Sequence, residues 1–237
     1  MNPILQFQQV CKKFSHIQVL DHINLEVCQG EFFGLVGVNG AGKTTLIKSV
    51  LDFCDIDQGE IYLFGVPHLQ PHARDHLAFL PEQFTPPPHL TGRRFLEYMI
   101  NMHGLPYNHE HVEFLCREAD LAIPALNQPV RSYSKGMAQK LGLVACFCSH
   151  KPLLILDEPM NGLDPKARVY LKKHLLQLKS QGTTIFFSTH LLADVESLCD
   201  RMGILHEGQL RFIGTPQHCC EKFATQNIEE AYLSCIQ

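Results

Sequence analysis

The chain has 237 residues, of which 45% are hydrophobic and 19% charged, and its net charge is −4. These figures exclude a disordered chain and give no general attraction to nucleic acid or anionic lipid, and the length fits one domain. No apolar run approaches the roughly 18 residues that cross a bilayer, and the first ten residues lack a secretory signal, so we expect a cytosolic protein with reduced cysteines.

The first third of the chain alternates between short apolar runs and turns. The pattern predicts strands at residues 4–10, 23–27 and 32–36, and a helix over 43–51. Two more strands are expected at 60–64 and 77–80, because turn residues precede the first and Pro81 closes the second.

The middle of the chain carries a helical pattern instead of strand signals. Residues 91–148 carry apolar side chains at helical spacing, which predicts an all-helical insertion. Strands are then expected at 153–156 and 183–189, helices at 165–178 and 191–199, and a strand pair at 202–205 and 209–213. The sequence therefore predicts an α/β fold: a mostly parallel sheet with flanking helices, an antiparallel β part and a helical insertion.

The strongest motif directly follows the strand at 32–36. Residues 37–45, here called the phosphate loop, match G-x-x-x-x-G-K-[ST] between a strand and a helix, the pattern of a P-loop NTPase. Backbone N–H groups and the helix N-terminus bind phosphate oxygens in such a loop. The alternative is a glycine-rich turn with a solvated lysine. The predicted nucleotide-binding residues are Asn39, Gly40, Ala41, Gly42, Lys43, Thr44 and Thr45.

Within this loop, each polar side chain has an expected partner on ATP. Lys43 should reach the β- and γ-phosphates, Thr44 should ligate Mg²⁺, and Thr45 should approach the α-phosphate. The cofactors expected from the motif are therefore ATP and Mg²⁺.

A pair of carboxylates ends the strand at 153–156. Asp157 is expected on the metal side, and Glu158 is expected to polarise an attacking water as the catalytic base. The alternative is an acidic turn that caps the following helix.

Three further segments narrow the class of protein. They are His190 at a strand end, Asn161-Gly162-Leu163-Asp164, and the signature segment, Tyr133-Ser134-Lys135-Gly136-Met137. In this order, with the phosphate loop and the acid pair, they resemble the ATP-binding cassette (ABC) ATPases, the nucleotide-binding subunits of ABC transporters. The resemblance implies one ABC ATPase domain over 1–237, in which 1–83 and 150–237 form a RecA-like core with an antiparallel β part and 84–149 form a helical subdomain.

The resemblance also implies a dimer. Two domains of this family pair head to tail, and each ATP lies between the phosphate loop of one and the signature segment of the other. The resemblance places Asp164 at the dimer interface. It also implies that the signature segment of one subunit contacts the γ-phosphate bound to the other, through Ser134, Lys135, Gly136 and Met137. A homodimer is favoured, and a different cassette as the second subunit is the alternative.

Two more roles follow from the resemblance. His190 would contact the γ-phosphate, acting with Lys43 and Glu158 in catalysis. Phe14 lies where the family stacks an aromatic ring on adenine, and the alternative is an ordinary core aromatic.

The sequence departs from the family pattern at two places. Lys135 and Met137 replace the third and fifth residues of Leu-Ser-Gly-Gly-Gln. The glutamine that usually links Mg²⁺ to the helical part aligns with Glu82 rather than with Gln83, so Glu82 is a further Mg²⁺ candidate whose role stays open. Both departures resemble a subgroup of exporter-type ATP-binding subunits.

A proline-rich stretch points to a membrane partner. Pro86, Pro87 and Pro88 stiffen the segment that meets the permease in relatives, so we expect residues 84–102 to dock on a transmembrane permease subunit. The alternative is a plain surface loop. The expected location is the cytoplasm, peripheral on the inner face of the cell membrane through that partner.

The function expected from these residues is ATP binding and hydrolysis that powers a separate membrane-embedded exporter through ATP-driven dimerisation. Two alternatives of the same fold stay open. One is a non-transport ABC ATPase that clamps DNA or ribosomes, although nucleic acid is not an expected partner of this acidic chain. The other is a hydrolysis-deficient ATP switch, which Glu82 keeps open while Glu158 and His190 argue against it.

Overall fold

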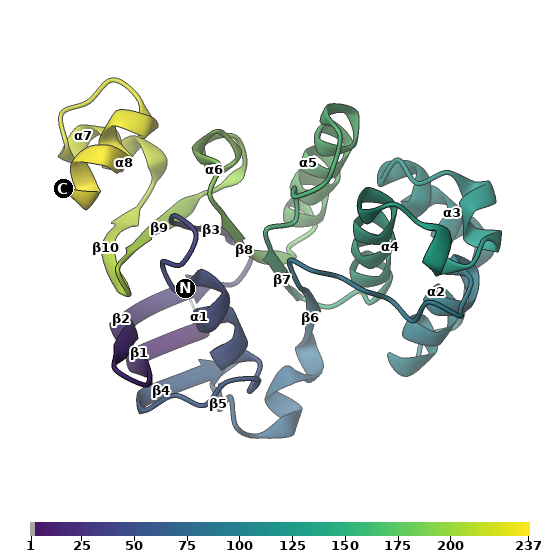
Figure 1. Cartoon of the computed structure of the whole chain (residues 1–237), viewed down its shortest axis with the longest axis horizontal. Coiled ribbons are helices and arrows are strands. Elements are labelled where there is room, and N and C mark those ends of the chain that lie inside the picture. The colour runs from purple at the N-terminus through teal and green to yellow at the C-terminus, as the bar shows by residue number, and fades with distance from the viewer. Residues whose placement is uncertain (1–2) are drawn as a thin grey trace.

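A computed structural model describes residues 3–237, and one of its two sheets is antiparallel. Residues 1 and 2, the start of the predicted domain, lie outside the described residues. The strand order in this sheet is β2-β1-β4-β5 (Figure 1). Its members are β1 (Pro3–Phe14), β2 (Ile17–Cys28), β4 (Gln58–Leu63) and β5 (Val66–Pro67).

The second sheet is mostly parallel, with the strand order β10-β9-β3-β8-β7-β6. The five strands from β9 to β6 pair in parallel, and β10 adds an antiparallel edge. Every residue of β3, β7 and β8 is buried, as expected for a parallel sheet covered on both faces. Its strands are β3 (Phe32–Val36), β6 (Leu77–Leu80), β7 (Leu153–Asp157), β8 (Thr184–Thr189), β9 (Arg201–His206) and β10 (Gln209–Gly214).

Alternate residues of the parallel sheet enter two separate cores. Phe33 and Leu35 pack in the core shared with the antiparallel sheet and with α1 (Lys43–Val50). Phe32 and Val36 face the opposite way, into the core formed with the other helices. The helix that follows the phosphate loop is therefore held between the two sheets.

The helices of the second core come from the middle and the end of the chain (Figure 1). None of the helices within residues 3–237 is both long and apolar enough to cross a membrane. Between β6 and β7 lie α2 (Gly92–Met102), α3 (His109–Glu118) and α4 (Lys135–Cys148). The others are α5 (Pro165–Ser180), α6 (Leu192–Leu198), α7 (Pro216–Lys222) and α8 (Ile228–Ile236).

The predicted fold class is confirmed, with differences in the antiparallel sheet. β1 and β2 form a hairpin of two 12-residue strands, longer than the predicted runs at 4–10 and 23–27. Lys12 and Lys13 break the apolar pattern there, yet the strand continues because its backbone pairs with β2. The two-residue strand β5 was too short to be predicted.

Candidate functional site

The phosphate loop connects the buried strand β3 to α1, as the motif requires. Gly42 caps the helix with φ of 110°, a left-handed conformation that favours glycine. A Cβ atom at Gly42 would lie 2.7 Å from the carbonyl oxygen of Val19 on β2. The loop is therefore packed against the hairpin, and a larger residue at position 42 would displace it.

Lys43 lies at the floor of the loop and is only 6% exposed. Its Nζ donates to the carbonyl oxygen of Gly37 at 2.7 Å and to that of Val38 at 3.3 Å. The same Nζ lies 3.3 Å from Oε1 of Glu158. The ammonium group of Lys43 is thus held by two carbonyl oxygens of the phosphate loop and by the carboxylate of Glu158.

The acid pair lies at the carboxyl end of β7, beside the end of β8. Ser188 joins the two acids: its Oγ donates to Oδ1 of Asp157 and accepts from the backbone N–H of Glu158 at 3.0 Å. Both acids are buried, and the carboxylate of Glu158 lies next to the ammonium group of Lys43. This hydroxyl was not predicted, because its position opposite Asp157 is set by the register of two neighbouring parallel strands.

Glu158 has an unusual backbone conformation for a residue with a side chain. Its φ is 49°, in the left-handed region, which costs about 1–3 kcal/mol for such residues and persists where the surroundings enforce it. Its Oε2 lies 2.9 Å from Nδ1 of His190, which directly follows β8. One carboxylate therefore lies between the Lys43 ammonium and the His190 imidazole, so the structure brings the three predicted catalytic side chains together.

Two of these three side chains, Lys43 and Glu158, line a cleft of about 310 Å³. Of the predicted nucleotide-binding residues, Ala41 does not line it, and Phe14 does not either among the described residues. Val19 and Val38 line the cleft without having been predicted, because no motif marks them. The full lining is Val19, Val38, Asn39, Gly40, Gly42, Lys43, Thr44, Thr45, Glu82 and Glu158.

Phe14 lies at the turn of the β1–β2 hairpin and is 49% exposed, which excludes the alternative of an ordinary core aromatic. The Nζ of Lys12 lies 5.3 Å from its ring centroid. The ring therefore offers a free face, and its stacking on adenine stays a prediction.

Glu82 lines the cleft and also a second cavity of about 290 Å³, which is lined as well by Gln83, Lys135 and Gln139. The side chain at this position therefore lies between the phosphate loop and the start of α4. Its neighbour Gln83 is exposed and lines only the second cavity.

The signature segment forms the start of α4. Ser134 is the N-cap, and its Oγ accepts from the backbone N–H of Met137 at 3.2 Å. Ser134 and Lys135 are exposed, and across residues 3–237 the cleft lining includes no member of the segment. A Cβ atom at Gly136 would lie 2.7 Å from the carbonyl oxygen of Gly162, so this end of the helix touches the loop that carries Asp164.

Asp164 caps α5 and accepts from the backbone N–H of Ala167 at 2.9 Å, which lowers the pKa of its carboxyl group. Lys140 lies 3.4 Å from the same carboxylate and 3.0 Å from that of Asp120. A hydrogen bond from Lys166 lowers the pKa of Asp120. This network was not predicted, since it joins α4 and α5 through the turn after α3.

The residues around the cleft fit a magnesium ion. Mg²⁺ prefers oxygen ligands in a near-octahedral arrangement and keeps several waters. Thr44 and Glu82 offer oxygen atoms at the cleft, and Asp157 lies buried behind it. The donor set therefore suits a hard divalent cation.

Comparisons with known proteins agree with this arrangement. A model of the ABC transporter family matches residues 20–161. An uncharacterized ABC transporter ATP-binding protein of Synechocystis sp. is 38% identical over 202 residues, covering 84% of this chain and 57% of that protein. The chain thus spans little more than half the length of that relative.

Two longer matches were also found. The Nod factor export ATP-binding protein I of Burkholderia pseudomallei is 34% identical over 232 residues, which cover 96% of this chain and 76% of that protein. A solved structure described as the ATP binding subunit of an ABC transporter superimposes with a TM-score of 0.87 at 30% identity, covering 98% of this chain and 99% of that one.

Proposed function

Because the chain belongs to the ABC transporter family and is an ABC ATPase cassette, we propose that it hydrolyses ATP to energise a separate membrane-embedded exporter. The observation that carries the proposal is the Glu158 carboxylate held between Lys43 and His190 beside a phosphate-loop cleft. Such positioned charges are what phosphoryl transfer requires of a protein. The Burkholderia relative is named for Nod factor export, which supports the direction of transport.

In the proposed reaction, the phosphate-loop amides and Lys43 bind the β- and γ-phosphates. Lys43 then exchanges its contact with Glu158 for phosphate oxygens, which leaves the carboxylate free to polarise the attacking water. His190 keeps that carboxylate oriented through its 2.9 Å contact and meets the γ-phosphate. Thr44 and Asp157 would hold Mg²⁺, with Glu82 as a further candidate ligand, and the ion would supply positive charge against the phosphates.

The whole chain is proposed to act as one ABC ATPase domain. Its RecA-like core comprises residues 1–83 and 150–237, and its helical subdomain comprises 84–149, which includes α2, α3 and α4. ATP would close two such domains, preferably two copies of this chain, with the exposed signature segment of one covering the cleft of the other. The exposure of Ser134, away from the cleft of its own chain, supports this arrangement in trans.

Ser134→Ala should abolish ATP-dependent pairing while leaving nucleotide binding by the monomer unchanged. The change removes both the helix cap, worth about 1 kcal/mol, and the hydroxyl offered to the second nucleotide. Pairing is measured by size-exclusion chromatography with ATP. Thr215→Ala, which removes a hydroxyl cap from α7, is the matched control and should still pair. Equal pairing by both variants would refute the role in trans.

The proposed docking surface comprises residues 84–102 and includes α2. One face of α2 exposes Arg94, Tyr98 and Met102 at four-residue spacing, and Tyr98 and Met102 are 57% and 65% exposed. Arg93 is engaged within the chain, with its Nη1 3.0 Å from Nδ1 of His109. The exposed face of α2 therefore offers two apolar side chains and one cation to a permease.

Arg94→Glu should prevent co-purification with a co-expressed membrane partner, because it reverses the charge beside the apolar contact. ATP hydrolysis by the isolated chain should stay unchanged. Arg117→Glu on α3 is the control, since Arg117 is exposed and pairs only with Glu113 of its own helix in the described structure. Normal recovery of the partner with Arg94→Glu would show that this face is a plain surface.

Phosphate release from ATP by the purified chain tests the proposed activity directly. Turnover with Mg²⁺ would exclude the hydrolysis-deficient switch, and binding without turnover would support it. A transport role additionally requires a multi-spanning partner, which would hold the chain on the cytoplasmic face of the membrane. Failure to recover such a partner, together with binding to DNA or ribosomes, would favour the non-transport alternative.

A further inference from the structure

The β1–β2 hairpin contains an irregularity that the nucleotide site does not use. Val10 pairs with Ile23 and Lys12 pairs with Leu20, so Cys11 alone lies opposite both Asp21 and His22. Two residues opposite one define a β-bulge, which redirects side chains. His22 adopts φ of 50°, in the left-handed region. The bulge therefore gathers a thiol, a carboxylate and an imidazole at one point of the sheet.

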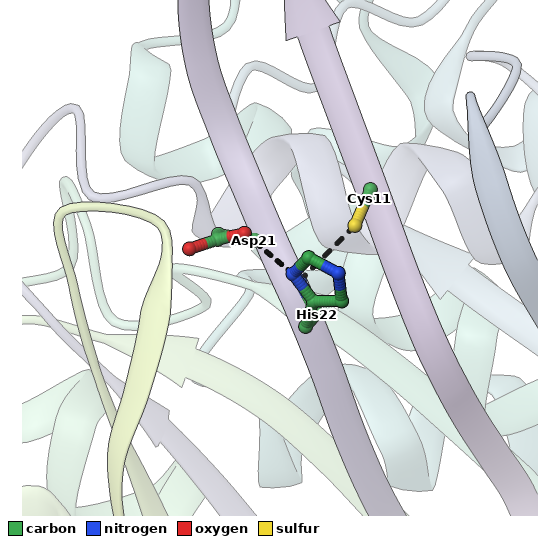
Figure 2. Close-up of side chains that lie close together, drawn as sticks. All are labelled: Cys11, Asp21 and His22. Atoms are coloured by element: carbon green, nitrogen blue, oxygen red, sulfur yellow. Dashed lines mark hydrogen bonds and ion pairs between the residues drawn. The ribbon is translucent and has the colours of Figure 1, made fainter.

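The three side chains lie close together across the two strands (Figure 2). The backbone N–H of His22 donates to Sγ of Cys11 at 3.2 Å, and Nδ1 of His22 lies 2.7 Å from Oδ1 of Asp21. In Figure 2 the sulfur points from β1 toward the histidine on β2. One ligand atom from each side chain lies within 4.8 Å of the other two.

We propose that Cys11, Asp21 and His22 bind a divalent transition-metal ion of the zinc class. Zinc takes thiolate, imidazole and carboxylate ligands at about 2.0–2.3 Å in tetrahedral sites. In a tetrahedral site such bonds place ligand atoms about 3.3–3.8 Å apart. Metal binding would therefore replace the 2.7 Å contact between Nδ1 of His22 and Oδ1 of Asp21 and draw the three ligand atoms, which lie within 4.8 Å of one another, around the ion. A thiol and an imidazole are poor ligands for Mg²⁺ and Ca²⁺, which separates this site from the predicted magnesium site.

The surroundings fit a site with an open coordination position. Cys11 is buried and His22 is exposed, so the cluster reaches the surface on one side, where water can complete the coordination. Gln209 of β10 donates to Oδ2 of Asp21 at 2.6 Å. Hydrogen bonds of this kind orient metal-binding carboxylates and leave the other oxygen available.

The site lies next to the phosphate loop without sharing a residue with it. The backbone N–H of Asp21 donates to the carbonyl oxygen of Gly208 at 2.8 Å, and the N–H of Gly208 donates to that of Ala41 at 3.3 Å. Metal binding can therefore be measured without nucleotide, and its failure would leave the proposed ATPase function intact.

Titration of the purified, reduced and metal-stripped chain with Co²⁺ tests the proposal. We expect one equivalent to give a thiolate-to-cobalt charge-transfer absorption, which Zn²⁺ then displaces. Cys11→Ser should remove the band. His22→Gln changes an exposed side chain, keeps the buried cysteine, and should weaken binding at least tenfold. Gln209→Ala should weaken it about 10- to 100-fold, the range for groups that orient metal ligands.

Two control variants make the result specific. His16→Gln changes an exposed histidine of the same hairpin, and Cys54→Ser removes a partly exposed cysteine elsewhere, so both should bind as the unaltered chain does. Absence of the band in the unaltered chain, or unweakened binding by His22→Gln, would overturn the proposal. Loss of the band in Cys54→Ser would overturn it as well, because another cysteine would then be the ligand.

Discussion

Glu158→Gln should reduce ATP turnover about 10²- to 10⁴-fold, the range that a positioned general base contributes. The amide keeps the size of the side chain and can still accept from Lys43, so the phosphate loop should retain its shape. It cannot accept the proton of the attacking water. Removal of the negative charge next to the γ-phosphate should also favour ATP retention, so the variant should accumulate as an ATP-bound dimer.

Phosphate release and size-exclusion chromatography with Mg²⁺ and ATP measure both parts of this result. Glu196→Gln on α6 is the matched control, since it removes an exposed carboxylate outside the cleft and should turn over normally. Full ATPase activity of Glu158→Gln would refute the role of this carboxylate as the base.

Lys43→Met should weaken ATP binding by about 2–4 kcal/mol, or about 30- to 1,000-fold, as expected when one partner of a buried charged contact is removed. The methionine fills the volume of the lysine stem but donates no hydrogen bond to phosphate. It also leaves the carbonyls of Gly37 and Val38 without their donor, and Glu158 without its ammonium partner. The loss therefore affects both the nucleotide and the loop that receives it.

Fluorescence titration with an ATP analogue measures this affinity, and circular dichroism confirms that the variant is folded. Lys48→Met on the same helix is the control, because Lys48 is exposed in the last turn of α1 and should bind normally. Unchanged affinity of Lys43→Met would contradict the assignment of the cleft as a nucleotide site.

The parts of the structure that the sequence predicted well are those fixed by neighbouring residues. The phosphate loop and its helix follow from glycine spacing, and the buried strands β3, β6 and β7 follow from short apolar runs. The grouping of Lys43, Glu158 and His190 was also expected, because Glu158 and His190 directly follow two parallel strands and Lys43 ends the loop that follows a third.

The features that escaped prediction depend on pairing between distant segments. The Ser188 hydroxyl between the two acids follows from the register of β7 and β8, which no local pattern fixes. The left-handed backbone of Glu158 is imposed by its surroundings. The bulge at Cys11 arises where the pairing of β1 and β2 shifts, so residues ten and more positions apart meet only in the fold.

The contact between Gly136 and the carbonyl of Gly162 has a mechanical consequence. There is no space for even a methyl group between the start of α4 and the turn before α5, and Lys140 joins the same two parts through Asp164. We therefore expect the two parts to move together. A second subunit that binds at the start of α4 would then act on α4 and the turn before α5 as one unit. Displacement of the signature segment would thereby be transmitted to the turn that follows Glu158, the proposed catalytic base.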